Sequence, residues 1–237
     1  MYALSDDEAG SNVDAVILCG GRGRRLGALT KYRPKPLIPI IGKPLIIWVI
    51  EQLMSLHIRR LIFVVNYLQS SIEKTVQDYI FNIINPPEII WVQQAYKESE
   101  GAVLSGVLAA TSSQIIVRCS DDLLSDKIVK GLLSANGVGG IMTRFVTSSP
   151  LLRPICQNER IIGGSLDDIL PIMTYNLCLD SNVLRQWCQD AVKFAQPMVN
   201  LIYQYLEREI YVIDGADSIG INTVADIQLA KKWLQET

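Results

Sequence analysis

The sequence predicts an α/β protein, a three-layer αβα sandwich built on a mainly parallel, Rossmann-like central sheet. Apolar runs of strand length alternate with longer amphipathic segments, which is the order of β-α-β units. Runs such as LIFVV and QIIV are apolar throughout, so we expect strands that are covered on both faces. No linker rich in proline, glycine or serine divides the chain. We therefore expect a single domain over residues 13–237, with helices on both sides of the sheet.

Each element is expected where the local pattern favours it. The expected strands are short apolar runs, many of them rich in β-branched residues: residues 14–19, 60–66, 88–93, 114–118, 140–145, 173–179 and 209–213. The expected helices are the longer amphipathic segments: residues 44–55, 70–81, 102–110, 126–133, 181–194, 197–208 and 224–235. Residues 148–168 are the least regular part of the chain, and we expect a flap or hairpin there, lying over the site.

Length and composition are those of an ordinary globular protein. The chain has 237 residues, of which 49% are hydrophobic and 19% charged, and its formal net charge is −2. It has no excess of basic residues for binding nucleic acid. The longest apolar stretch, residues 37–54, is interrupted by prolines and charged residues, which excludes a membrane span. Residues 1–12 are polar and acidic, unlike a secretory signal, so we expect a disordered tail and a cytoplasmic protein.

Residues 15–44, AVILCGGRGRRLGALTKYRPKPLIPIIGKP, carry most of the functional prediction. An apolar strand leads into a glycine turn that is followed by basic residues: Gly20, Gly21, Gly23, Arg24 and Arg25. Glycines let backbone N–H groups approach phosphate oxygens, and an arginine can bind two such oxygens at once. Lys35, fixed between two prolines, would add a point charge. The stretch therefore predicts a strand followed by a phosphate-binding loop.

Other chemistries fit the sequence less well. The turn lacks the third glycine of the G-x-G-x-x-G dinucleotide fingerprint and the G-K-[ST] of a P-loop. The five cysteines have no C-x-x-C spacing, so neither a disulfide framework nor a zinc site is predicted. His57 is the single histidine, and nothing near it in the sequence resembles a nucleophile site.

Residues 18–44 resemble the signature of the sugar-1-phosphate nucleotidyltransferases, or NDP-sugar pyrophosphorylases, which share the nucleotide-diphospho-sugar transferase fold. That signature is similar to L-[AC]-G-G-x-G-x-R-L-x-x-L-T-x-x-x-P-K-P-L-x-P-[IV]-x-G-K-P, and the chain matches it nearly throughout. The resemblance implies a Mg²⁺-dependent attack by a sugar 1-phosphate on the α-phosphorus of a nucleoside triphosphate, releasing pyrophosphate. It further implies that Arg25 holds the triphosphate and Lys35 the reacting phosphates, with Leu18 and the glycine turn lining the nucleotide site.

Two later positions resemble the part of the family site that reads the base. Gln94 and Gly101 resemble the glutamine and the glycine that contact the base in these enzymes. A glutamine side chain offers both a donor and an acceptor, so it could pair with a base edge. The alternative is a surface glutamine without such a role.

The metal ligands are also implied by the resemblance. Asp121 follows a buried apolar strand, as the family's magnesium ligand does, and a carboxylate there suits Mg²⁺. The alternative is that Asp121 or Asp122 caps the helix expected from residue 126. Near the C-terminus, the segment G-I-N-T resembles the G-V-D-T or G-V-N of related enzymes, which makes Asn222 the second ligand and Asp217 the alternative.

The acceptor side departs from the family. The E-K-P motif, whose lysine holds the sugar phosphate, has no counterpart between residues 157 and 171, so no sugar-binding residue is assigned. The main hypothesis is transfer of NMP from an NTP to a sugar 1-phosphate, in nucleotide-sugar biosynthesis. The alternatives are a cytidylyltransferase for a non-sugar phosphorylated alcohol or acid, and a catalytically silent regulatory relative. The base, the acceptor and any homo-oligomer are left open by the sequence.

Overall fold

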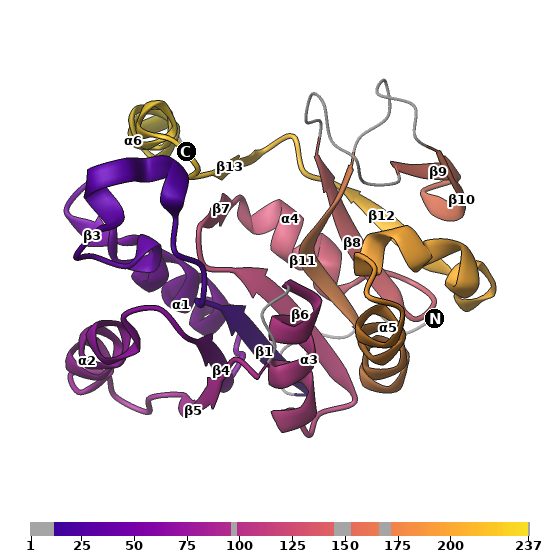
Figure 1. The fold of residues 1–237 in the computed structure, drawn as a ribbon, viewed down its shortest axis with the longest axis horizontal. Coiled ribbons are helices and arrows are strands. Elements are labelled where there is room, and N and C mark those ends of the chain that lie inside the picture. The colour runs from indigo at the N-terminus through magenta and orange to yellow at the C-terminus, as the bar shows by residue number, and fades with distance from the viewer. Residues whose placement is uncertain (1–11, 96–98, 145–152, 166–171, 237) are drawn as a thin grey trace.

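The computed structural model describes residues 12–95, 99–144, 153–165 and 172–236, so the expected disordered tail lies almost wholly outside the described residues. Within this part of the chain, nine strands form one sheet in the order β5-β4-β1-β6-β11-β8-β12-β10-β9 (Figure 1). These strands are β1 (Val13–Leu18), β4 (Arg60–Val65), β5 (Glu88–Gln93), β6 (Gln114–Cys119), β8 (Gly139–Arg144), β9 (Arg153–Gln157), β10 (Arg160–Ser165), β11 (Ile172–Asp180) and β12 (Ile210–Asp214).

Helices and two small sheets complete the described fold. The α-helices are α1 (Leu45–Ser55), α2 (Gln69–Ile80), α3 (Ser99–Ala109), α4 (Asp126–Leu133), α5 (Ser181–Phe194) and α6 (Val224–Glu236). Short 3₁₀ segments cover Arg24–Thr30, Lys35–Leu37 and Met198–Arg208. The small sheets pair β2 (Pro39–Ile40) with β3 (Lys43–Pro44), and β7 (Asp122–Leu124) with β13 (Ser218–Gly220).

One half of the large sheet is parallel. β1 lies between β4 and β6 and runs parallel to both, and β5 continues the parallel order beyond β4. β11 is antiparallel to its neighbours β6 and β8, while β12 is again parallel to β8. The carboxyl ends of β1, β4, β5 and β6 therefore meet at one edge, where open α/β sheets bind ligands.

Each face of the sheet has its own apolar core. In β1, Val16 packs into one cluster and its neighbours Ala15 and Ile17 into another, and all three side chains are fully buried. The first cluster includes residues of α3 and α5, and the second includes residues of α1, α2 and α4 (Figure 1). The predicted α/β fold, a mostly parallel sheet flanked by helices, is confirmed, and the double covering explains why the strands do not alternate with polar residues.

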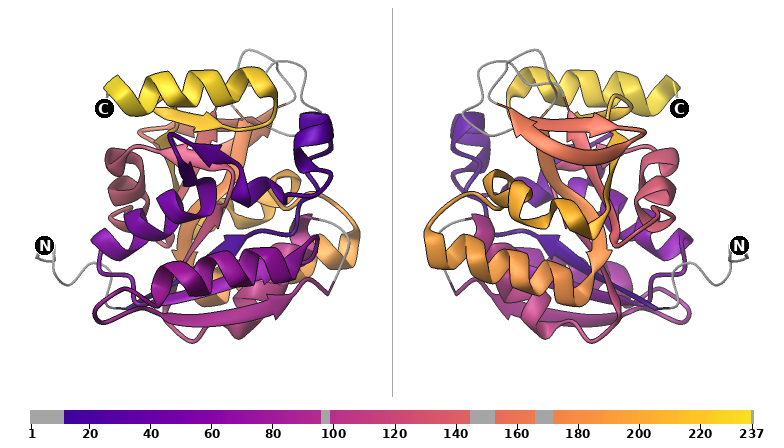
Figure 2. Two further views of the ribbon diagram at one scale, coloured as in Figure 1. Left: turned by 90° about the vertical axis from the view of Figure 1, so that its left-hand side faces the viewer. Right: turned by 90° about the vertical axis from the view of Figure 1, so that its right-hand side faces the viewer.

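A third, smaller core holds the segments that surround the candidate site. It joins residues of the 24–45 segment, β7, the end of β13 and α6: Leu26, Ile38, Ile40, Leu45, Leu123, Ile221, Ile227 and Ala230. Figure 2 shows α6 lying across the top of the molecule, directly above β13. This cluster fixes the loop after β1 against the C-terminal part of the chain.

Two features differ from the sequence-based expectation. The expected flap or hairpin is in part a β9–β10 hairpin, but it extends the far edge of the sheet beyond β12, four strands from β6, and does not lie over the site. Residues 145–152 and 166–171 of that region lie outside the described residues. The expected helix at 197–208 is a 3₁₀ segment. Among the residues described, no helix combines the length and apolar character needed to cross a bilayer.

Candidate active site

The glycine turn after β1 is shaped by close approaches. A Cβ at Gly20 would lie 2.4 Å from Oε1 of Gln94, so any other residue would displace the Gln94 side chain from its present position. Gly23 has φ +60° and would place a Cβ 3.1 Å from Cβ of Lys35, so a side chain there would be both strained and crowded. The carbonyl oxygen of Gly23 accepts hydrogen bonds from Leu26 N (2.9 Å) and Thr30 Oγ1 (3.0 Å). The turn is thereby folded back against the segment that carries Lys35.

A cavity of about 900 Å³ opens at the carboxyl ends of these strands. It is lined by most of the residues predicted for the site: Leu18, Gly20, Gly21, Gly23, Arg24, Arg25, Lys35, Gln94, Asp121 and Asn222. Gly101 is the exception: it is buried in α3, where its carbonyl oxygen accepts a bond from Ser105 Oγ (2.7 Å), and its neighbour Ala102 lines the cavity instead. The structure therefore brings together residues that are up to about 200 positions apart in the chain.

The cations and oxygen ligands at the centre of the cavity contact one another. Arg25 Nη2 donates to Asn222 Oδ1 at 2.6 Å, and Lys35 Nζ donates to the same oxygen at 3.1 Å. Lys35 Nζ also forms an ion pair with Asp121 Oδ2. The side chain of Lys35 is only 11% exposed and that of Asp121 26% exposed, so this pair is partly shielded from water. A lysine, an arginine, a carboxylate and an amide thus converge on one point.

The backbone explains why Asp121 and Asn222 are adjacent. Asp121 lies in the turn between β6 and β7, and Ser120 ties that turn to β1 by donating from Oγ to Leu18 O (2.6 Å). β7 pairs with β13 in antiparallel register, and Ile221 N donates to Asp121 O (2.9 Å). Asp217, at the other end of this pairing, accepts from Trp233 Nε1 (3.0 Å) and is not among the residues that line the cavity. Of the two predicted alternatives, Asn222 therefore lines the cavity and Asp217 does not.

The position of Gly220 cannot carry a ligand. A Cβ there would lie 2.4 Å from Arg144 Nη1 and 2.6 Å from Asp122 Oδ1. A side chain at this position would have to displace the ion pair between Arg144 and Asp122, whose nearest atoms are 3.2 Å apart. Asn222, two residues later, presents the side-chain oxygen that accepts a hydrogen bond from Lys35.

The oxygen donors fit a magnesium ion that is completed by substrate. Among the described residues, no group of three or more His, Cys, Asp or Glu side chains could hold a metal alone. Mg²⁺ commonly takes one or two protein oxygens and fills its octahedron with waters and phosphate oxygens. Asp121 and Asn222 offer that number of oxygens, and both contact Lys35.

The alternative role of Asp121 or Asp122 as a helix cap is wrong, because the N-cap residue of α4 is Ser125.

The thiols at the cavity are not poised for catalysis. Burial raises the pKa of Cys19 to about 12, and burial together with nearby carboxylates raises the pKa of Cys119 well above its ordinary value. Both thiols therefore stay protonated at neutral pH, and a protonated thiol is a poor nucleophile.

Cavity residues that the sequence did not single out include Asn66 and Tyr67, directly after β4. The rule that ligands bind at the carboxyl ends of parallel strands could have identified them.

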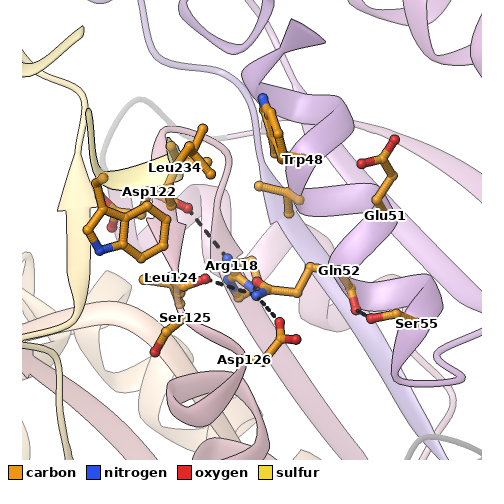
Figure 3. Close-up of a pocket in the computed structure, with 13 residues that line it drawn as sticks. Trp48, Glu51, Gln52, Ser55, Arg118, Asp122, Leu124, Ser125, Asp126 and Leu234 are labelled. Atoms are coloured by element: carbon orange, nitrogen blue, oxygen red, sulfur yellow. Dashed lines mark hydrogen bonds between the residues drawn. The ribbon is translucent and has the colours of Figure 1, made fainter. Parts of the chain in front are cut away.

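A second cavity, of about 520 Å³, is lined by residues of α1, β6, β7, α4 and α6 (Figure 3). Arg118 forms its floor and is fully buried, with Nη1 donating to Gln52 Oε1 (2.9 Å) and Nη2 lying 3.4 Å from Asp122 O. Gln52 in turn donates to Leu124 O (2.9 Å) and to Asp126 Oδ1 (2.8 Å). Burial lowers the pKa of Arg118 to about 10, so it remains charged at neutral pH and links α1 to β6 and β7.

The chain is similar in sequence to known nucleotidyl transferases. The sequence model of the family described as "Nucleotidyl transferase" matches residues 14–143. The chain is 32% identical over 126 residues to a "Bifunctional protein GlmU" of Methanococcus maripaludis, a match that covers 53% of this chain and 29% of that protein. It is 24% identical over 230 residues to a "Bifunctional IPC transferase and DIPP synthase" of Aquifex aeolicus, covering 94% of this chain and 52% of that protein.

The fold has counterparts among solved structures. A putative glucose-1-phosphate thymidylyltransferase from Bacillus anthracis superposes with a TM-score of 0.74 at 17% identity, over 95% of this chain and 96% of that one. At this identity the likeness concerns the fold alone. The chain spans 29% and 52% of the lengths of the two curated relatives, so their complete activities do not transfer to it directly.

Proposed function

The chain belongs to the nucleotidyl transferase family, and on this premise we propose that it transfers NMP from an NTP to a sugar 1-phosphate, giving an NDP-sugar and pyrophosphate. The observation that carries the proposal is the convergence of Arg25, Lys35, Asp121 and Asn222 in a cavity at the carboxyl edge of the parallel strands. Catalysis of phosphoryl-type transfer depends mainly on positioning and on charge stabilisation, and this cluster supplies both.

The residues of the cavity divide the work between them. The glycine turn and Arg24 bind the triphosphate, and Gln94, which touches the turn at Gly20, faces the base. Gly101, behind Ala102, belongs to the backbone that shapes the base site. Arg25 orients the triphosphate, and Lys35 offers its charge to the α-phosphate and the incoming phosphate. Asp121 and Asn222 would hold Mg²⁺, which when bound would neutralise phosphate charge and align the reacting groups.

The transfer itself needs no acid or base from the protein. An oxygen of the acceptor phosphate forms a bond to the α-phosphorus, and the bond from that phosphorus to the bridging oxygen of the β-phosphate breaks, so pyrophosphate leaves. The acceptor phosphate is already an anion at neutral pH. The lack of a histidine among the described cavity residues is compatible with such a reaction. Arg25 and Lys35 then lower the barrier by stabilising charge as it shifts toward pyrophosphate.

A second acceptor class is favoured by one specific observation. The relative that aligns with 94% of this chain is named as an IPC transferase and DIPP synthase, and the chain lacks the lysine motif for a sugar phosphate. A cytidylyltransferase for a phosphorylated alcohol is therefore the second candidate. In either case we place the reaction in the cytoplasm, where nucleoside triphosphates are available, and assign it to residues 13–237 as one catalytic domain.

Pyrophosphate release tests the proposal. The four ribonucleoside triphosphates and dTTP are each combined, with Mg²⁺, with glucose 1-phosphate, N-acetylglucosamine 1-phosphate, inositol 1-phosphate and phosphocholine. We expect one base and one acceptor class to give turnover well above a Lys35→Ala control. Turnover with inositol 1-phosphate or phosphocholine alone would support the second candidate. No turnover with any pair, together with nucleotide binding, would indicate a silent regulatory relative.

A further inference from the structure

β11 changes register beside the candidate site. Its pairing with β8 is regular up to Met173 and resumes at Leu177, so residues 174–176 form an irregular stretch. On the other side, its pairing with β6 reaches only as far as Leu177 opposite Val117. The last residues of β6, which lead into the Asp121 turn, therefore have no strand partner on this side. Irregularities of this kind often redirect side chains next to active sites.

Asn176 takes over the missing strand contact. Its side chain is fully buried, and its Oδ1 accepts a hydrogen bond from the backbone N–H of Cys119 at 3.0 Å. Its Nδ2 donates to Asp122 Oδ2 at 2.6 Å. Cys119 and Asp122 stand immediately before and after the pair Ser120 and Asp121. A single amide side chain thus bridges both ends of the turn that presents Asp121 to the cavity.

The carboxylate of Asp122 is committed to this bridge. Its Oδ1 lies 3.2 Å from Arg144 Nη2, so the buried charge is paired. The residue is 8% exposed and lines the second cavity, whereas Asp121 lines the first and contacts Lys35. The two adjacent aspartates therefore face different surroundings. A charged partner on one side and an amide on the other hold Asp122, whereas Asp121 pairs with Lys35 in the first cavity.

We infer that Asn176 is a positioning residue, which fixes the Asp121 carboxylate for metal binding by clamping the β6–β7 turn at both ends. This inference rests on the proposed function. Besides Asn176, the turn is held by Ser120, which bonds to Leu18 O, and by Ile221 N, which bonds to Asp121 O. These bonds restrain the middle of the turn. At its ends, Cys119 also pairs with Leu18 in β1 and Asp122 with Gly220 in β13, but the Asn176 side chain contacts both ends at once. Loss of the amide leaves the part-buried Cys119 N–H and Asp122 Oδ2 without these hydrogen bonds, while Asp122 Oδ1 keeps its contact with Arg144, so we expect the turn to rearrange.

Metal binding by the full chain tests the clamp without requiring turnover. The probe is Mn²⁺ with each of the five triphosphates in turn, because substrate completes the metal's coordination, and binding to the protein is followed by electron paramagnetic resonance. Asn176→Ala is expected to weaken Mn²⁺ binding about 10–100-fold, the usual cost of removing a residue that supports a metal ligand. The matched control is Asp14→Asn, because Asp14 is also buried and accepts from the backbone N–H groups of Thr111 and Ser112, at the opposite end of β1. The control is expected to lose stability and keep its Mn²⁺ affinity.

A double-mutant cycle provides the second readout. In the Asp121→Asn background, adding Asn176→Ala is expected to cost no further activity, because Asn176 acts through Asp121. Equal losses in both backgrounds, or unchanged Mn²⁺ binding by Asn176→Ala, would overturn the inference. If Asn176→Ala does not fold, Asn176→Ser is measured in the same way. A chain that binds Mn²⁺ in an Asn176-dependent manner yet turns over no substrate pair would refute the proposed function and leave the clamp standing.

Discussion

Replacing Lys35 by alanine is the sharpest test of the residues at the cavity centre. Lys35 Nζ contacts both Asp121 and Asn222, and no other lysine lines the cavity among the described residues. Its side chain is 11% exposed, so water cannot readily replace the lost charge. Removing one such preorganised group costs about 10²–10³ in kcat, or roughly 3–4 kcal/mol of transition-state stabilisation. We expect a loss of that size in Lys35→Ala.

The effect on folding should be much smaller than the effect on catalysis. The partner, Asp121, is 26% exposed and can be hydrated when the lysine is gone. Partly exposed ion pairs typically contribute only about 1 kcal/mol or less to the free energy of unfolding. Activity and stability therefore separate in this variant, and a urea unfolding curve measured beside the kinetics shows whether they do.

Lys43→Ala is the matched control for Lys35→Ala. Lys43 belongs to the same segment and pairs with Glu51, and its Nζ lies 3.8 Å from the centre of the Trp48 ring. It does not line the cavity. Initial rates of pyrophosphate release are compared for the two variants at saturating substrate. A kcat loss below tenfold in Lys35→Ala, or equal losses in both variants, would refute the charge-stabilisation argument.

Three further predictions concern the second ligand, the helix packing and acid stability. Asn222→Asp keeps an oxygen for the metal and for Lys35, so its kcat should stay within about tenfold of the wild type, whereas Asn222→Ala should lose about 10² or more; steady-state kinetics with varied Mg²⁺ separates the two. Gly106→Ala in α3 would place a Cβ 2.3 Å from Cγ1 of Val16, so overpacking should cost about 1–3 kcal/mol in urea unfolding despite the better helix propensity of alanine. Burial alone would raise the pKa of Asp226, but hydrogen bonds from the backbone N–H groups of Asn222 and Thr223 outweigh it and lower that pKa. Its contribution to stability is therefore fully present above the ordinary aspartate pKa of 3.8 and lost as pH falls through the lowered value, so the urea midpoints of the wild type and Asp226→Asn should differ at pH 6 and converge as pH falls below 3.8.

Much of the parallel half of the fold could be predicted because its signals are local. The apolar run of β4 and the amphipathic pattern of α4 each carry their own evidence, and α4 begins and ends at the predicted residues. The small pair β7–β13 could not be predicted, because each strand has three residues and is defined only by its distant partner. The β9–β10 hairpin was expected in the right region but in the wrong place, because sequence pattern does not say which sheet edge a hairpin joins.

The residues that line the candidate cavity could be predicted where one motif contains them. Residues of the glycine turn and Lys35 lie close in sequence, so their spacing is informative, and Asp121 is marked by the end of a buried strand. Asn176 carried no such mark, because its role depends on an irregular register in β11 that no local pattern reveals. Gly101 was assigned to the base site, yet Ala102 is the residue that reaches the cavity, a shift of one position along α3.

Label transfer tests the central claim most directly. The active pair from the substrate panel is incubated with Mg²⁺ and with the triphosphate labelled either at the α- or at the γ-phosphorus. We predict that the α label moves to the acceptor conjugate, that the γ label appears in pyrophosphate, and that Lys35→Ala slows both together. Transfer of the γ label to the acceptor, or its release as inorganic phosphate, would contradict nucleotidyl transfer as the reaction of this cavity.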